Sequence, residues 1–261
     1  MTVDNAVWVE SADAPKQPAK WRLGGALWLL GLPGVVAVVW ALLPALKANE
    51  ALLPLPLWAV VLLSGLQTAV LLAVAVALGV ALAPRVGLAV PVVSAWLQGR
   101  PVVPALRQQL MPGLWGGLAG AAWLWALSLI APDALKPSDP ASTMPWSVKL
   151  LYGGITEELL VRWGVMTLLL WLGWRLLQRG EGAPRTGLVA MAVGLSALLF
   201  ALGHLPAAHA MAGVLTPSVV AFVLLGNTAF GVVAGVLYAR NGLEAAIVAH
   251  VLAHAVSHPF L

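Results

Sequence analysis

Residues 146–174 read WSVKLLYGGITEELLVRWGVMTLLLWLGW, an apolar run that carries Glu157, Glu158 and Arg162 close together. An ionised side chain at the depth of a bilayer costs about 3 kcal/mol or more on insertion scales. Three such groups on neighbouring turns therefore need partners, a hydrated cavity, or both. In an apolar helix this pattern indicates a functional site.

The composition of the whole chain supports a membrane setting for this stretch. Of its 261 residues 61% are hydrophobic and only 9% are charged, and the mean hydropathy is +0.93. Soluble domains carry roughly 25% charged residues, so the composition predicts a polytopic membrane protein. The basic residues form no cluster that suggests a nucleic-acid partner. The absence of cysteine excludes disulfides, thiolate metal sites and a cysteine nucleophile. The polar first twenty residues lack an apolar core, so we expect no cleavable signal peptide.

A membrane-spanning helix needs about 20 apolar residues, and seven stretches qualify. They are approximately 23–46, 57–83, 113–131, 147–174, 187–204, 216–239 and 242–258. We therefore expect an all-α membrane bundle of about seven transmembrane helices, with an eighth helix within 86–99 or 101–112 as an alternative. The chain divides into a polar tail at 1–20, about three spans within 21–145, and a core of about four spans at 146–261.

The basic residues alternate between the two ends of these spans, which predicts an orientation. One side holds Lys16, Lys20, Arg22, Arg85, Arg100, Arg107, Arg175, Arg179, Arg185 and Arg240, whereas the other holds Lys47, Lys136 and Lys149. Cytoplasmic loops carry the excess of Lys and Arg. We therefore expect a multi-pass protein of the cell membrane with a cytoplasmic N-terminus.

Helical spacing separates the two glutamates of the fourth span. Glu158 and Arg162 are four residues apart in the favourable acid-first order, so they share a face and form an ion pair. Glu157 points about 100° away and has no partner on its own helix. Gly153 and Gly154, one turn earlier, allow close approach of another helix or a substrate. The alternative for Glu158 and Arg162 is a buried salt bridge with a purely structural role.

Histidines at the ends of two later spans are the other candidates for chemistry. His204 ends the fifth span, and His250, His254 and His258 follow at intervals of four in the seventh, so they form one stripe. Two histidines four residues apart present their imidazoles to one metal or one substrate, although polar contact between helices is the ordinary alternative. His209 is interpreted as a solvated loop residue.

Together these motifs resemble one known family. The pattern consists of Glu157-Glu158-x-x-x-Arg162, then Phe200-x-x-x-His204, then His250-x-x-x-His254. In this order it is similar to the CPBP intramembrane proteases, which include the type II CAAX prenyl endopeptidases and bacterial relatives linked to bacteriocin processing and self-immunity. The resemblance covers roughly 146–258 and implies that Glu157 and His204 activate water, and that His250 helps to hold the oxyanion. Where the family usually has Asn or Asp, this chain has His254.

We therefore expect an intramembrane endopeptidase with Glu157, Glu158, Arg162, His204, His250 and His254 as its site. Its partners would be a membrane protein or peptide substrate and the lipid bilayer, and the oligomeric state is open. No cofactor is expected, and the alternative is a zinc ion held by Glu157, His204, His250 and His254. The competing functions are a non-catalytic scaffold or immunity protein of the same fold and a proton-coupled transporter.

Overall fold

The computed structural model describes residues 18–136 and 144–257, and throughout them the regular elements are helices. Most of the polar tail, with Lys16, lies outside the described residues, as do His258 and part of the proline-rich joint at 132–140. The elements are α1 (Lys20–Ala48), η1 (Glu50–Leu52), α2 (Leu57–Leu82), η2 (Ala83–Arg85), α3 (Pro91–Leu97), α4 (Val102–Ser128), η3 (Asp133–Leu135), η5 (Val148–Thr156), η6 (Leu159–Met166), α5 (Thr167–Leu177), α6 (Thr186–Gly203), α7 (Leu205–Ala212), α8 (Pro217–Arg240) and α9 (Leu243–Ser257).

The helical membrane bundle expected from the hydropathy pattern is confirmed. Within the described residues, six helices are long and apolar enough to cross a membrane, and the seventh expected span is the shorter helix α9. Elements η5, η6 and α5 run on from one another as the fourth of these spans. The chain is therefore a multi-pass membrane protein.

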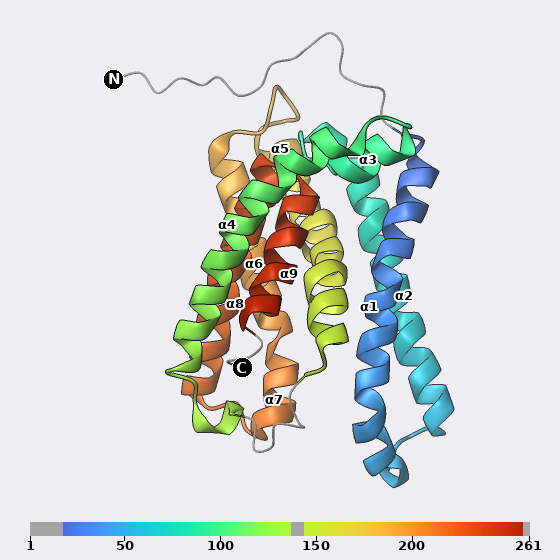
Figure 1. Cartoon of the computed structure of the whole chain (residues 1–261), viewed down its shortest axis with the longest axis vertical. Helices are drawn as coiled ribbons and strands as arrows, with labels where there is room; N and C mark the ends of the chain where they lie inside the picture. Colours follow the sequence, from blue (N-terminus) through green and yellow to red (C-terminus); the bar gives the residue numbers. More distant parts are fainter. Residues whose placement is uncertain (1–17, 137–143, 258–261) are drawn as a thin grey trace.

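The third span is longer than its sequence suggested. Helix α4 begins at Val102 and continues through Pro112, whereas the hydropathy pattern placed its start near 113. Pro104 lies in the first turn, where backbone N–H groups have no intrahelical partner, so it does not stop the helix. The short helix α3 occupies part of the 86–99 stretch and lies at one end of the bundle (Figure 1).

Helix α9 packs closely against α4, and glycines make this approach possible. A Cβ atom at Gly113 would lie 2.7 Å from Val248 Cβ, and one at Gly117 would lie 2.7 Å from Leu252 Cβ. Small residues let membrane helices approach until their backbones nearly touch. The C-terminal helices thus surround α9, while α1 and α2 form a hairpin at the side of the bundle (Figure 1).

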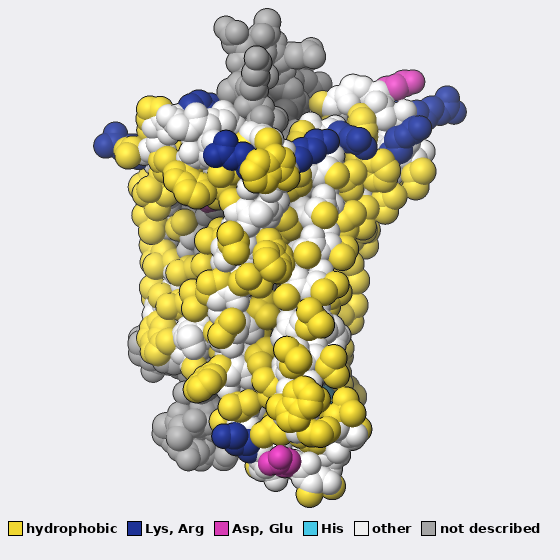
Figure 2. Space-filling view, turned by 90° about the vertical axis from the view of Figure 1, so that its right-hand side faces the viewer, with side chains coloured by type: hydrophobic (Ala, Val, Ile, Leu, Met, Phe, Trp, Pro, Cys, Tyr) yellow, Lys and Arg dark blue, Asp and Glu magenta, His cyan; other side chains and the backbone are white. Residues whose placement is uncertain are grey.

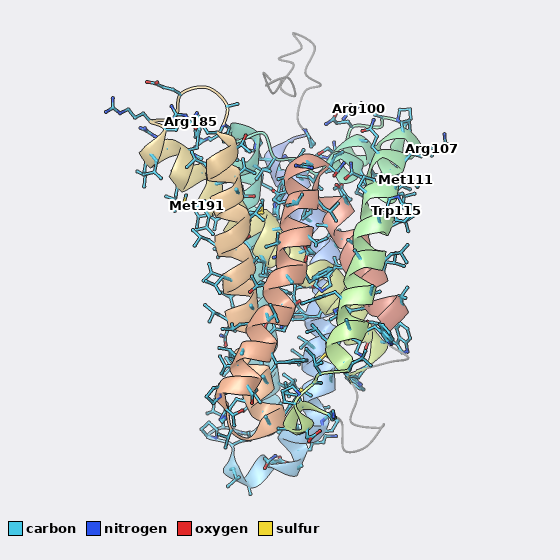
Figure 3. The ribbon with its side chains drawn as sticks, turned by 90° about the vertical axis from the view of Figure 1, so that its left-hand side faces the viewer. Arg100, Arg107, Met111, Trp115, Arg185 and Met191 are labelled. Atoms are coloured by element: carbon cyan, nitrogen blue, oxygen red, sulfur yellow. The ribbon has the colours of Figure 1, made fainter. Side chains whose placement is uncertain are left out.

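One end of the bundle is basic. Arg100, Arg107 and Arg185 lie at the same end, with Trp115 and Met191 further along the helices (Figure 3). Figure 2 shows a row of basic side chains at this end, above an apolar band that reaches nearly to the opposite end. We call this end the basic rim, and its residues are Lys20, Arg22, Arg85, Arg100, Arg107, Arg175, Arg179, Arg185 and Arg240.

Candidate active site

The fourth span is π-helical on both sides of Glu157 and Glu158. Elements η5 and η6 have the wider turn, whereas the sequence predicts an ordinary α-helix with about 100° between the two glutamates. The Thr156 and Thr167 hydroxyls each donate to a carbonyl oxygen five residues earlier, at 3.2 and 3.3 Å. The Thr156 hydroxyl also lies 2.7 Å from Gly31 O on α1, which ties the span to the hairpin. Such π-helical turns are rare and occur frequently at functional sites.

Glu158 is the centre of a buried triad with Arg162 and His250. Its Oε2 lies 3.3 Å from Arg162 Nε, which is the pairing expected from their spacing. Its Oε1 accepts a hydrogen bond of 2.8 Å from His250 Nδ1, across 92 positions of sequence. The side chains of Glu158 and Arg162 are fully buried, and His250 is 3% exposed. Glu158 therefore joins η6 to α9 as well as neutralising the arginine.

Phe200 lies between this triad and His204. The guanidinium carbon of Arg162 lies 4.9 Å from the centroid of the Phe200 ring, which is a cation–π contact. The two terminal nitrogens of Arg162 have no hydrogen-bond partner among the described residues. The same phenyl ring meets the His204 ring edge-on at 4.6 Å. Phe200 thus positions a cation and an imidazole on the same side of α6.

His204 is held by the last turn of α6. Its Nδ1 lies 2.8 Å from the Phe200 carbonyl oxygen. Because a carbonyl oxygen only accepts, Nδ1 carries the proton and Nε2 of the neutral ring is left as an acceptor. His250 has the same arrangement, since its Nδ1 donates to Glu158. Two imidazoles are therefore fixed in one tautomer, each with Nε2 available for chemistry.

His254 stacks on His250, and a glycine makes room for it. The two rings are 4.9 Å apart with an interplanar angle of 27°. A Cβ atom at Gly153 would lie 3.1 Å from His254 Nε2, so a larger residue there would push the imidazole away. The stripe that the sequence predicts on α9 is thus directed at η5, the helix that leads to Glu157.

A small cavity lies among these histidines. It has about 50 Å³ of space and is lined by His204, His250 and His254 together with Leu124, Phe200, Gly226, Asn227, Phe230 and Ala253. A buried water needs roughly 10–15 Å³ and several polar partners, so the cavity can hold water. Asn227, which is not among the candidates named from the sequence, presents its side chain here, with one amide hydrogen donated to Val223 O at 2.9 Å. An amide inside an apolar span is the sequence signal that could have identified it.

Glu157 is not one of the residues that line this cavity. It is half-buried and follows Gly153, which contacts His254, by one helical turn. Within 18–136 and 144–257, no hydrogen bond or ion pair engages its carboxylate. His209 is exposed, as its interpretation as a solvated residue requires, but it lies in helix α7 and not in a loop. In the described part of the chain, no group of three or more His, Asp or Glu side chains is placed to hold a metal ion.

Comparison with known proteins identifies a family that resembles part of this chain. Residues 139–256 match the family model described as Type II CAAX prenyl endopeptidase Rce1-like. This part of the chain is similar to that family. The match includes all six expected site residues and confirms the resemblance predicted from the three motifs. The Rce1-like family is a protease family, so the match supports peptide-bond hydrolysis in general terms. No curated protein and no solved structure matches the chain.

Proposed function

We propose that the chain is an intramembrane endopeptidase that hydrolyses a peptide bond in a membrane-associated protein or peptide. The observation that carries this proposal is the cavity lined by three imidazoles within a membrane bundle. Two of them, His204 and His250, have Nδ1 engaged and Nε2 left as an acceptor. The Glu157 carboxylate, which pairs with no described residue, follows Gly153 by one helical turn, and Gly153 makes room for His254.

In the proposed reaction, His204 Nε2 accepts a hydrogen bond from a water molecule, and Glu157 takes the proton of that water as general base. The water oxygen adds to the carbonyl carbon of the substrate and forms a tetrahedral oxyanion. Glu157 then returns the proton to the leaving amine as the C–N bond breaks. Catalytic hydrogen bonds are often long in the unliganded state and tighten when substrate binds, so in this proposal Glu157 need not line the cavity before substrate is bound.

The oxyanion needs hydrogen-bond donors, and the geometry changes which residues we assign to this role. The family resemblance implies this role for His250. In the neutral tautomer His250 Nε2 carries no proton, so His250 would donate only as an imidazolium, which the Glu158 carboxylate would stabilise. Asn227 Nδ2 has a second hydrogen beyond the one bonded to Val223 and lines the same cavity. We therefore add Asn227 to the proposed donors.

Replacing Asn227 with Ala tests this role. Removing one oxyanion donor typically lowers kcat by about 10²–10³-fold, and we expect a loss of this size with little change in KM. The matched control is Thr228→Ala, the next position on α8, which does not line the cavity. The assignment is wrong if the two variants cleave a peptide substrate at the same rate.

The proposed orientation follows from the basic rim. If this rim is cytoplasmic, as the positive-inside rule implies, the site lies nearer the outer face of the cell membrane. Helix α6, with 18 residues, separates His204 from the rim, whereas α7, with 8 residues, separates it from the other end. A site near the outer face favours a peptide or protein delivered through the membrane over a prenylated protein presented from the cytoplasm.

Cysteine labelling tests this orientation without background, because the chain has no cysteine. We expect a membrane-impermeant maleimide added to intact cells to label Ala134→Cys, since Ala134 is exposed in η3 at the end opposite the rim. Glu181→Cys, exposed in the turn between α5 and α6, should react only after the cells are permeabilised. The opposite pattern would reverse the orientation and with it the preference among substrates.

The reaction can be tested directly with the full chain in liposomes. Two probes share one cleavable sequence: one ends in a prenylated CAAX tail and the other has a transmembrane anchor without a prenyl group. We expect hydrolysis of the anchored probe, with new termini identified by mass spectrometry. Hydrolysis of the prenylated probe alone would support a peptidase but contradict the proposed substrate class, and hydrolysis of neither would contradict both.

Metal dependence is a separate prediction. We expect purified protein to contain substoichiometric zinc and to keep its activity after chelation, since a glutamate and an imidazole suffice to activate water. Elemental analysis and cleavage assays before and after chelation measure this. If stoichiometric zinc is found, and if its removal and return switch cleavage off and on, zinc would replace Glu157 as the group that activates water.

A further inference from the structure

A groove of about 500 Å³ runs between α1 and α2 near the basic rim. None of the residues that line it lines the cavity of the candidate active site. It belongs to the hairpin at the side of the bundle, a part of the chain outside the family match (Figure 1). Its volume is in the range of about 300–1,000 Å³ typical of small-molecule sites. The groove has no role in the proposed hydrolysis.

The groove exists because both helices present small residues to it. Gly24 and Gly25 line it from α1, opposite Ala73, Ala77 and Ala81, which repeat every fourth residue along α2. A Cβ atom at Gly25 would meet no heavy atom within 4 Å. One at Gly24 would only touch the methyl groups of Val76 and Val80, at 3.9 and 4.0 Å. The space between the helices is therefore open to an apolar occupant.

The ends of the groove differ in a way that suits one acyl chain. Toward the middle of the bundle, the Trp28 indole N–H donates to Ala69 O at 3.0 Å and bridges the two helices. At the rim, Lys20 and Trp21 flank the open end, and Trp21 is 79% exposed. The helical rise from Lys20 to Trp28 is about 12 Å, close to the depth of one leaflet in a hydrocarbon core about 30 Å thick.

Charge determines which lipid the groove favours. Among the described residues that line it, Lys20 is the only charged one. Lys20 belongs to the basic rim, and Figure 2 shows the basic row above the apolar face that α1 and α2 contribute. Basic pockets between membrane helices bind anionic lipid headgroups, and anionic lipids gather at the cytoplasmic surface. We propose that this groove binds one acyl chain of a phospholipid whose anionic headgroup pairs with Lys20.

The floor of the groove connects the lipid to the rest of the bundle. Val76, which lines the groove, accepts a hydrogen bond of 3.3 Å through its carbonyl oxygen from the Trp163 indole on η6. One turn further, Gly79 lies against the same indole, where a Cβ atom would overlap the ring. A bound chain would therefore rest on the layer that packs against η6. The lipid would stabilise the docking of the hairpin on the helix that holds Arg162.

Native mass spectrometry of the full chain tests the proposal with two phospholipids that have identical acyl chains, phosphatidylglycerol and phosphatidylcholine. We expect wild type to retain one phosphatidylglycerol at least threefold more often than phosphatidylcholine. Lys20→Gln should remove this preference, whereas Lys47→Gln, at the far end of α1, should keep it. Gly24→Leu should reduce retention of both lipids at least threefold, because its side chain occupies the groove.

Gly194→Leu is the matched control for the glycine variant, since Gly194 is exposed on α6 and a Cβ atom there would meet nothing within 4 Å. If Gly24→Leu fails to fold, Gly25→Leu replaces it, because Gly25 has open space around its Cβ position. Wild-type retention in the groove-filling variant would overturn the site. Equal retention of the two lipids by wild type would overturn the role of Lys20 and leave a groove for any apolar chain.

Discussion

Replacing Glu157 with Gln is expected to lower kcat/KM for peptide cleavage by about 10²–10⁴-fold, the usual contribution of a general base. The amide keeps the size of the side chain but cannot accept the water proton. The protein should stay folded, because no described residue pairs with the Glu157 carboxylate. Cleavage by protein in liposomes and thermal unfolding in detergent measure the two effects.

Glu50→Gln is the control for this variant, since Glu50 is exposed in η1 at an end of the hairpin. It should cleave at the wild-type rate. If Glu157→Gln also cleaves at the wild-type rate, Glu157 is not the base. A folded wild-type protein without any cleavage would instead favour the non-catalytic scaffold that shares this fold.

Replacing Arg162 with Ala is expected to lower the free energy of unfolding by about 3–5 kcal/mol, as for other broken buried pairs. The change leaves Glu158 fully buried beside His250 without its guanidinium partner. It also removes the cation that packs on Phe200. Denaturation in mild detergent should show a lower midpoint, and Arg185→Ala on the exposed rim should show no change.

A second variant separates the charge from the packing. Removing both members of a buried pair is often nearly neutral, so Glu158→Gln combined with Arg162→Ala should recover part of the lost stability. If the Arg162 variant is as stable as wild type, the ion pair with Glu158 does not stabilise the fourth span. If the double variant is no better than the single one, the loss arises from the contact with Phe200.

The membrane bundle and half of the site could be predicted from the sequence because they depend on local patterns. Long apolar runs located the spans, and the acid-first spacing of Glu158 and Arg162 located their ion pair. The spacing of His250 and His254 predicted a shared face, which the stacked rings display. Each of these features is decided within a few turns of one helix.

The remaining features depend on contacts between distant parts of the chain. The bond from His250 to Glu158 joins α9 to the fourth span, and no spacing rule relates residues so far apart. One π-helical turn ends at Thr156, whose hydroxyl also bonds to the Gly31 carbonyl oxygen on α1. A helical wheel of the fourth span alone does not include this contact with another helix. Asn227 reaches the cavity only because α8 packs beside α9.

The central claim is that Glu157 and His204 together make this bundle a peptidase. The most direct measurement compares wild type, Glu157→Gln and His204→Ala, each in liposomes with the anchored peptide in ¹⁸O-labelled water. The account predicts that wild type releases a fragment whose new carboxylate carries one solvent oxygen, and that both folded variants release almost none. Equal release by all three proteins, or none by wild type, would contradict it.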